Sequence, residues 1–160
     1  MVKDAVATAG GLELHGYLPA AVVRERAPTF DEVYGEHARF VWRVLRGMGI
    51  REAGIDDAVQ DVFIVVHRRL REFDGKHALS TWLFAIAYRV ACDHRRKHRR
   101  VSSLDPLDDE KRALIVLAEL EEQTVPQIAA ITGSSVNTIY TRLRRARLEL
   151  QAALMKRGAP

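Results

Sequence analysis

This sequence predicts an all-α protein made of two small helical domains. Apolar residues recur at helical spacing from Thr29 onward, and the alternation typical of strands appears nowhere over a useful length. Residues 124–147 read TVPQIAAITGSSVNTIYTRLRRAR, in which a glycine separates two short helical patterns and the second becomes strongly basic. At 160 residues the chain has room for one or two domains, and its apolar fraction of 48% is ordinary for a globular protein.

A flexible tail, residues 1–28, is predicted to precede the first helix. Scattered Gly and Pro residues leave room there for only a short helix around Ala20–Arg26. The first long helix begins at Thr29, whose spacing to Glu32 is that of a capping box. The glycines that follow, from Gly47 onward, predict its end.

Two further helices complete a predicted first domain, residues 29–98. Asp56 can cap the second helix, which carries an apolar stripe. Residues 73–79 contain an Asp-Gly pair and are predicted to form a loop. The third helix follows this loop and runs into the basic segment HRRKHRR at 94–100.

A linker at 99–106 joins this domain to a second one, predicted at 107–156. The second domain opens with a helix that begins near Asp108 and carries Leu114 and Leu117 on its inward side. This helix is expected to pack against the two short helical patterns that follow it.

Those two patterns form a predicted helix-turn-helix. Thr124 and Gln127 stand at capping-box spacing, Gly133 can end a helix with positive φ, and Ser134 or Ser135 can cap the next helix. The outward side of that second helix carries Asn137, Thr138, Tyr140, Thr141, Arg142, Arg144 and Arg145. In a helix-turn-helix the second helix lies in the DNA major groove and reads base edges. An ordinary helical hairpin with a solvated basic face is the alternative.

Positive charge is concentrated in two stretches, although the net charge is only +4. Arg and Lys gather at 89–100 and 142–147, a distribution typical of phosphate-binding surfaces. Cations also suit the carboxyl end of a helix, but the seven consecutive basic residues exceed what capping requires. Acidic residues gather at 56–61 and 105–122, which indicates different faces for different partners.

The composition argues against an enzyme or a metalloprotein. Cys92 is the only cysteine, and the histidines show no close ligand spacing with it. No nucleophile with a partner and no glycine-rich phosphate cradle appears, so we expect no cofactor. No apolar run is long enough to span a bilayer, and the amino terminus lacks a signal-peptide pattern, so the expected location is the cytoplasm.

Several features stay open on the residues alone. The loop at 73–79 can receive an extruded base or serve only as a connection. The patch Asp56–Asp61 suits the start of a helix, and we interpret it as a protein-contact surface as well. Trp82 is interpreted as a core residue, whereas Tyr88 can be core or can stack on a base.

With these residues in view, the chain resembles the bacterial RNA polymerase sigma factors of the extracytoplasmic-function group over residues 29–155. Three stretches carry the resemblance: DDAVQDVFIVVHRRLREFDG at 56–75, STWLFAIAYRVACDHRR at 80–96, and TRLRRARLEL at 141–150. The resemblance implies a three-helix domain like sigma region two and a helix-turn-helix domain like region four. It also implies a non-enzymatic initiation factor that directs core RNA polymerase to minus-ten and minus-thirty-five promoter elements.

The resemblance further implies where each partner binds. Contacts with the clamp helices of the largest polymerase subunit fall on Asp57, Gln60 and Asp61. Minus-ten contacts fall on Asp74, Lys76, His77, Tyr88, Arg89, His94, Arg95 and Arg96. Minus-thirty-five contacts fall on Ser135, Asn137, Thr138, Thr141, Arg142 and Arg145. The flap of the second-largest subunit, promoter DNA and an anti-sigma factor are the other expected partners, and no insertion into a membrane is expected.

Two features depart from the family pattern. Relatives often carry Asn where this chain has Arg89, which changes the expected minus-ten preference. The linker is also short, since residues 99–106 reach at most about 28 Å when extended. Promoter elements about seventeen base pairs apart lie roughly 58 Å apart along the duplex. Because relatives have a longer linker, we expect a segment of the natural linker to be missing near Arg100–Leu107.

A stand-alone helix-turn-helix regulator that does not bind core polymerase is the alternative function. It explains residues 107–156 equally well. It gives no purpose to the basic helix at 80–100 or to the acidic patch at 56–61, so we favour the sigma factor.

Overall fold

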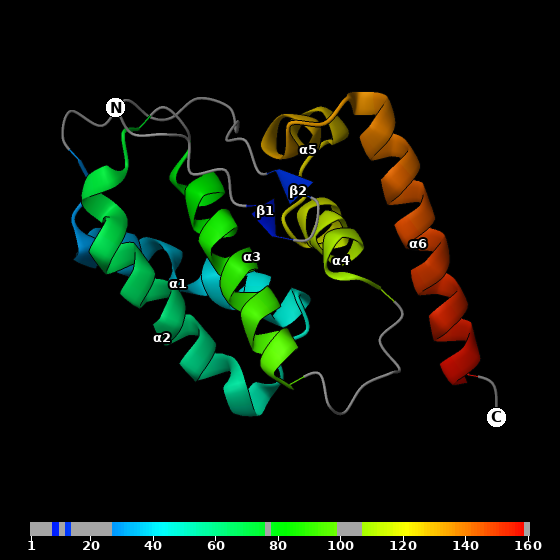
Figure 1. Cartoon of the computed structure of the whole chain (residues 1–160), viewed down its shortest axis with the longest axis horizontal. Coiled ribbons are helices and arrows are strands. Elements are labelled where there is room, and N and C mark those ends of the chain that lie inside the picture. Colours follow the sequence, from blue (N-terminus) through cyan, green and yellow to red (C-terminus); the bar gives the residue numbers. More distant parts are fainter. Residues whose placement is uncertain (1–7, 10–11, 14–26, 76–77, 99–106, 159–160) are drawn as a thin grey trace.

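The protein is described from a computed structural model, which describes residues 8–9, 12–13, 27–75, 78–98 and 107–158. The described chain is helical apart from one very short strand pair, and its two halves lie side by side (Figure 1). The predicted all-α fold with two helical halves is confirmed.

The first half consists of helices α1 (Phe30–Gly47), α2 (Glu52–Arg69) and α3 (Leu79–His98), with a 3-10 turn η1 (Leu70–Glu72) after α2. Each of the three helices packs against the other two. The capping box at the start of α1 forms as predicted, because the N–H of Thr29 donates to Oε2 of Glu32 over 2.8 Å.

The start of α2 differs from the prediction. The helix begins at Glu52, after an extended Arg51, and therefore one turn before Asp56. Ile55 is buried in this extra turn, so the apolar stripe begins earlier than the capping pattern indicated. Asp56 lies exposed in the second turn and is not the cap.

The second half consists of α4 (Asp109–Ile115), a π-helical segment η3 (Val116–Leu120), α5 (Val125–Thr132) and α6 (Val136–Gly158). Asp108 caps α4, since its Oδ1 accepts the N–H of Lys111 over 2.8 Å. Gly133 ends α5 with φ of +63°, which the helix-turn-helix pattern predicted. Helix α6 forms the outer edge of the molecule, beyond α4 (Figure 1).

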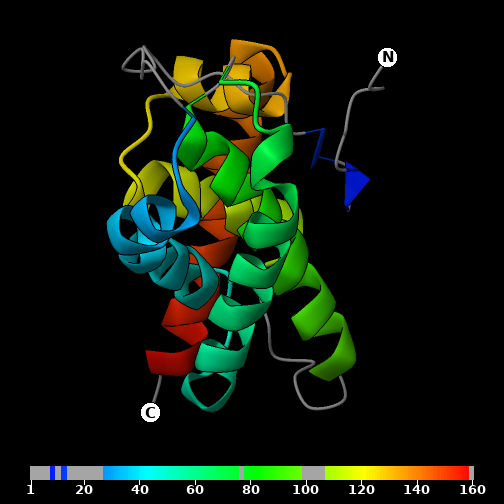
Figure 2. The same cartoon turned by 90° about the vertical axis from the view of Figure 1, so that its left-hand side faces the viewer.

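The two halves share one apolar core. Buried residues of all six helices belong to a single cluster, and the end of α1 packs against η3. A Cβ atom on Gly47 would lie 2.6 Å from Cδ1 of Leu120 and 2.8 Å from Cγ2 of Val116. The missing side chain at Gly47 is therefore what lets the halves approach. Seen from the first half, α6 runs behind the other helices (Figure 2).

A short strand pair, β1 (Thr8–Ala9) and β2 (Leu12–Glu13), lies in the predicted tail. The strands are antiparallel, with Thr8 opposite Glu13. This ladder was not predicted, and it is too small to alter the fold class. The helix predicted around Ala20–Arg26 and the linker at 99–106 lie outside the described residues.

Replacing Gly133 with alanine is expected to lower the free energy of unfolding by about 1–2 kcal/mol, because a Cβ atom is disfavoured at positive φ. Gly54→Ala is the matched control: Gly54 lies in α2, and no atom stands within 4 Å of its added Cβ. That control should be neutral or slightly stabilising. Urea unfolding measures both, and a Gly133→Ala protein as stable as the wild type would contradict the turn geometry.

Candidate nucleic-acid interface

Helix α6 is held against α5 and α4 by one buried side. Ile139, Leu143 and Ala146 have at most 2% of their surface exposed, and they follow the three- and four-residue spacing of a helix face. Ile128 and Ile131 of α5 are buried in the same core cluster. This packing fixes which side of α6 faces outward.

The amino end of α6 is closed by its own side chains. Ser135 is the cap, since its Oγ accepts the N–H of Thr138 over 3.1 Å. The hydroxyls of these two residues also lie 2.8 Å apart. Asn137 and Thr141 are exposed beyond the cap, and the Thr141 hydroxyl donates to the carbonyl oxygen of Asn137 over 3.0 Å. Short polar groups at this end of a recognition helix are suited to contact base edges.

The basic residues of α6 are exposed but paired with carboxylates. The guanidinium of Arg142 donates to the carboxylate of Glu110 in α4, and 43% of the Arg142 side chain is exposed. Arg145 donates to Oε1 of Glu149 over 3.1 Å, and Lys111 donates to Oε2 of the same carboxylate over 2.8 Å. The hydrogen bond from Lys111 lowers the pKa of Glu149 and raises the pKa of Lys111. These pairs hold the arginines in place and can exchange for DNA phosphates.

Tyr88 is not a DNA contact in this structure, which corrects the prediction from the resemblance. It is fully buried and stacks on Phe84 with ring centroids 6.4 Å apart. Burial raises the pKa of Tyr88, and burial also raises the pKa of the neighbouring Cys92 thiol to about 12. Both groups therefore stay protonated and structural at neutral pH.

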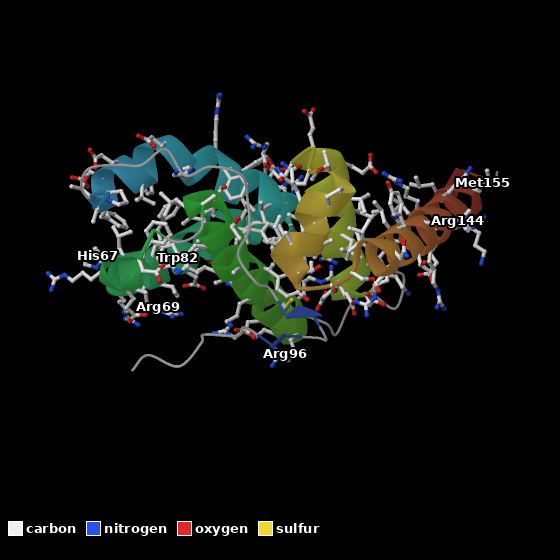
Figure 3. All side chains as sticks on the ribbon, turned by 90° about the horizontal axis from the view of Figure 1, so that it is seen from above. His67, Arg69, Trp82, Arg96, Arg144 and Met155 are labelled. Atoms are coloured by element: carbon white, nitrogen blue, oxygen red, sulfur yellow. The ribbon has the colours of Figure 1, made fainter. Side chains whose placement is uncertain are left out.

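The remaining basic residues of α3 divide between two sides of the helix. Arg89 and Arg96, seven residues apart, are exposed on one side, and Arg96 lies at the surface near the end of α3 (Figure 3). His94 and Arg95 pair with carboxylates on other helices, whereas Arg96 pairs with Asp93 on its own helix. Nε2 of His94 lies 2.8 Å from Oδ2 of Asp61, and Nε of Arg95 donates to Oδ1 of Asp109 over 2.6 Å.

The described residues of the predicted base-receiving loop, 73–75 and 78–79, lie between η1 and the first turn of α3. Phe73 and Trp82 are half-buried at its two sides, with ring centroids 5.5 Å apart, and Asp74 is exposed. Trp82 therefore packs against the core, as predicted, although its side chain is only half-buried. Figure 3 shows it at the opposite end from Arg144. Two predicted contacts, Lys76 and His77, lie outside the described residues.

The predicted polymerase-binding residues lie along one exposed side of α2. Asp57, Gln60 and Asp61 are all exposed, and they follow the spacing of a helix face. Asp61 also pairs with His94, so α2 and α3 are joined at this point. Gln60 also lines a cavity between α1 and α2 that the sequence did not predict.

This cavity is open and largely apolar, and its volume is about 480 Å³. Its lining residues are Phe30, Tyr34, Gln60, Phe63, Ile64, His67 and Arg68. Tyr34 lies on α1 with 49% of its surface exposed, so one of these rings is open to solvent. The sequence does show the four aromatic rings that line this cavity, at Phe30, Tyr34, Phe63 and His67. Helical periodicity alone places such residues in the core, so it did not predict a cavity.

Other kinds of site find little support in the described part of the chain. Within the residues that the structure describes, no group of three or more His, Cys, Asp or Glu residues could hold a metal ion. Among the same residues, no helix has the length and hydropathy needed to cross a membrane.

Comparison with known families matches both halves of the chain. Residues 33–101 match sigma-70 region 2, and residues 102–150 match sigma-70 region 4. The RNA polymerase sigma factor CnrH of Cupriavidus metallidurans is 29% identical, with 84% of this chain and 90% of that protein covered. The ECF RNA polymerase sigma factor SigM of Mycobacterium tuberculosis is 26% identical, with 86% and 83% covered.

Solved structures show the same fold. The structure of CnrH in complex with the cytosolic domain of CnrY superposes with a TM-score of 0.64 at 32% identity, covering 81% of this chain and 89% of that one. The Bartonella quintana sigma factor RpoE in complex with the anti-sigma factor NepR gives a TM-score of 0.63 at 21% identity, with 79% and 96% covered. The alignment with CnrH extends over 174 positions yet covers only part of this 160-residue chain, so CnrH has residues without a counterpart here.

Proposed function

The chain belongs to the extracytoplasmic-function sigma factors, and we propose that its surfaces divide polymerase binding and promoter recognition among them. It is a transcription initiation factor without enzymatic activity, which binds core RNA polymerase and directs it to promoters. Both family regions occur in order on one chain, which does not favour a stand-alone helix-turn-helix regulator.

Helix α6 reads the minus-thirty-five element in this proposal. The observation that supports it is the exposed outer side of a helix whose inner side is fixed by buried apolar residues. Asn137 and Thr141 lie toward its amino end, where a recognition helix contacts bases. Arg142 directly follows Thr141, and Arg145 lies about one turn further on; their guanidinium groups can bind bases or phosphates.

The minus-ten element binds to the exposed side of α3 and to the loop before it. Arg89 and Arg96 are outward-facing cations along α3, and such cations supply phosphate contacts that position melted DNA. Asp74 and the Phe73–Trp82 ring pair border the place where an extruded base would enter. His94 and Arg95 join this surface only if they leave their present carboxylate partners.

Core polymerase docks on α2 in this proposal, with the clamp helices of the largest subunit against Asp57 and Gln60. The second half binds the flap of the second-largest subunit. An anti-sigma factor is a further proposed partner, because the similar structures include sigma factors solved with protein partners. A protein that works with core polymerase and promoter DNA is expected in the cytoplasm.

The experiment that tests the function is comigration of the purified chain with sigma-free core RNA polymerase, followed by run-off transcription on a promoter library. Binding with promoter-dependent transcripts is the expected result, and it would deliver the recognition sequence. Binding without transcripts would identify the short linker as the defect. Specific duplex binding without any polymerase binding would favour an ordinary helix-turn-helix regulator.

Asp57→Ala is expected to weaken binding to core polymerase at least about fivefold, since interface residues that matter contribute more than about 1 kcal/mol each. Glu52→Ala is the matched control, because Glu52 is an exposed carboxylate on the same helix outside the proposed contact. Asp61 is a poorer choice, since removing it also breaks the contact with His94. Fluorescence titration with core enzyme measures the affinities, and equal losses in both variants would remove Asp57 from the interface.

A further inference from the structure

One lysine of α4 lies beside the recognition helix α6 and is held by two carboxylates. Nζ of Lys111 donates to Oε2 of Glu149 in α6 over 2.8 Å, and it lies 3.1 Å from Oδ2 of Asp108. Only 24% of the Lys111 side chain is exposed. Because both carboxylates compete with a DNA phosphate for this ammonium group, Lys111 is poorly placed to bind promoter DNA itself.

Glu149 joins Lys111 to a proposed DNA contact. Its Oε1 accepts a hydrogen bond from Nε of Arg145 over 3.1 Å, while its Oε2 accepts the one from Lys111. The hydrogen bond from Lys111 lowers the pKa of Glu149, so this carboxylate stays ionised well below neutral pH. Glu149 is therefore held at both oxygens, by one cation of α4 and one cation of α6.

Arg145 is the outermost member of this chain of contacts. Its side chain is 74% exposed, and its bond to Glu149 uses Nε and not the two Nη groups. The two Nη groups together can bind a phosphate or a guanine base in a bidentate manner. An arginine that is already held in one direction loses less rotamer freedom when it binds DNA, which favours binding.

The other arginine of this surface is supported differently. Arg142 donates directly to Glu110 of α4, with no residue between them. Both arginines line a cavity of about 180 Å³ between α4 and α6. The lining residues are Asp108, Glu110, Lys111, Leu114, Arg142 and Arg145. Helix α4 thus supports the two arginines separately, through Glu110 for Arg142 and through Lys111 and Glu149 for Arg145.

We propose, on the basis of the function above, that Lys111 is a positioning residue for minus-thirty-five recognition: it anchors Glu149, and Glu149 sets the direction of Arg145. Lys111 contributes to promoter binding without touching DNA. Removing its ammonium group leaves Glu149 held at one oxygen, and Arg145 then moves with Glu149 relative to α4. A supporting residue of this kind keeps a contacting side chain in the geometry that binding requires.

The first test measures the NMR order parameter of the Arg145 Nε–H bond in the full chain, without DNA or polymerase. Lys111→Met is expected to lower it toward the flexible range, below about 0.6, while the order parameter of Arg142 stays unchanged. Lys156→Met is the charge-matched control, because Lys156 is exposed near the end of α6. Equal order parameters of Arg145 in the two variants would overturn the proposal.

The second test measures the affinity of the holoenzyme for the promoter duplex found by library selection. Lys111→Met is combined with Arg145→Ala in one double-mutant cycle and with Arg142→Ala in another. The first cycle is expected to show a coupling of at least about threefold in the dissociation constant, and the second is expected to be additive. If Lys111→Met weakens binding equally with and without Arg145, Lys111 contacts DNA directly and the proposal fails. Equal coupling in both cycles would also overturn it, because the loss would then be structural.

Glu149→Gln keeps both tests decisive if Lys111→Met loses helicity in circular dichroism. It removes the carboxylate that joins the two cations, so it should lower the order parameter of Arg145 and couple to Arg145→Ala in the same way. Its charge-matched control is Glu119→Gln, since Glu119 pairs with Arg147 instead.

The two tests also separate this proposal from the function on which it rests. A chain that binds no core polymerase would remove the sigma role, while the order parameter of Arg145 would still test its support by Lys111. A holoenzyme that binds the promoter without coupling between Lys111 and Arg145 would remove only the role of Lys111.

Discussion

Arg142→Ala is expected to lower transcription from a responsive promoter by roughly 5–150-fold, the range that corresponds to the 1–3 kcal/mol of a good arginine contact with a base. The arginine is exposed on the outer side of α6, and its buried neighbour Leu143 fixes the direction in which it points. Its partner Glu110 is a carboxylate that DNA can replace. Run-off transcription on the promoter found by library selection measures the effect.

The control for this substitution is Arg147→Ala. Arg147 lies on the same helix and pairs with Glu119, but it is not among the proposed base or phosphate contacts. Promoter selectivity that is unaltered in Arg142→Ala would remove this residue from the recognition surface. A loss that is uniform across promoter sequences, with a salt slope reduced by about one, would instead assign Arg142 to a phosphate.

The helix-turn-helix could be predicted from the sequence because its determinants are local. The capping box at Thr124 and the positive φ of Gly133 depend on residues within a few positions of the turn. The outward side of α6 follows from Ile139 and Leu143, which repeat at helical spacing inside the same helix. Local chemistry was sufficient here, and the structure reproduces each of these elements.

The sides of α3 could not be predicted in the same way. Its apolar residues show which side meets α1 and α2, but a further side meets the second half. That contact includes the pair between Arg95 and Asp109 of α4, which the periodicity of α3 alone does not reveal. Tyr88 is therefore buried and Arg95 is paired, although both looked available when α3 was considered as one helix. Residues with an apolar body and a polar tip, such as tyrosine, are suited to either environment.

The first residue of α2 could not be predicted either, for a similar reason. Aspartates in a first helical turn and in a second turn look alike in a sequence, and Asp56 matched the cap pattern. The burial of Ile55 against the other helices extends the helix by a turn. Helix boundaries depend on such tertiary contacts, which explains why the existence of α2 could be predicted and its first residue could not.

Ile139→Ala is expected to lower the free energy of unfolding by about 2–5 kcal/mol, because the side chain is fully buried and its loss leaves a cavity beneath the recognition helix. Val136→Ala is the control on the same helix: 40% of Val136 is exposed, and its truncation should cost much less. Urea unfolding monitored by circular dichroism measures both variants, with the m value showing whether the transition stays two-state.

The same variant also tests whether the two halves unfold together. The two tryptophans, Trp42 and Trp82, lie in the first half, whereas Ile139 lies in the second. Because the halves share one apolar core, the tryptophan fluorescence transition should shift to lower urea together with the circular dichroism transition. If Ile139→Ala left the tryptophan transition in place, the halves would be independent folding units, and the closed interface around Gly47 would contribute little to stability.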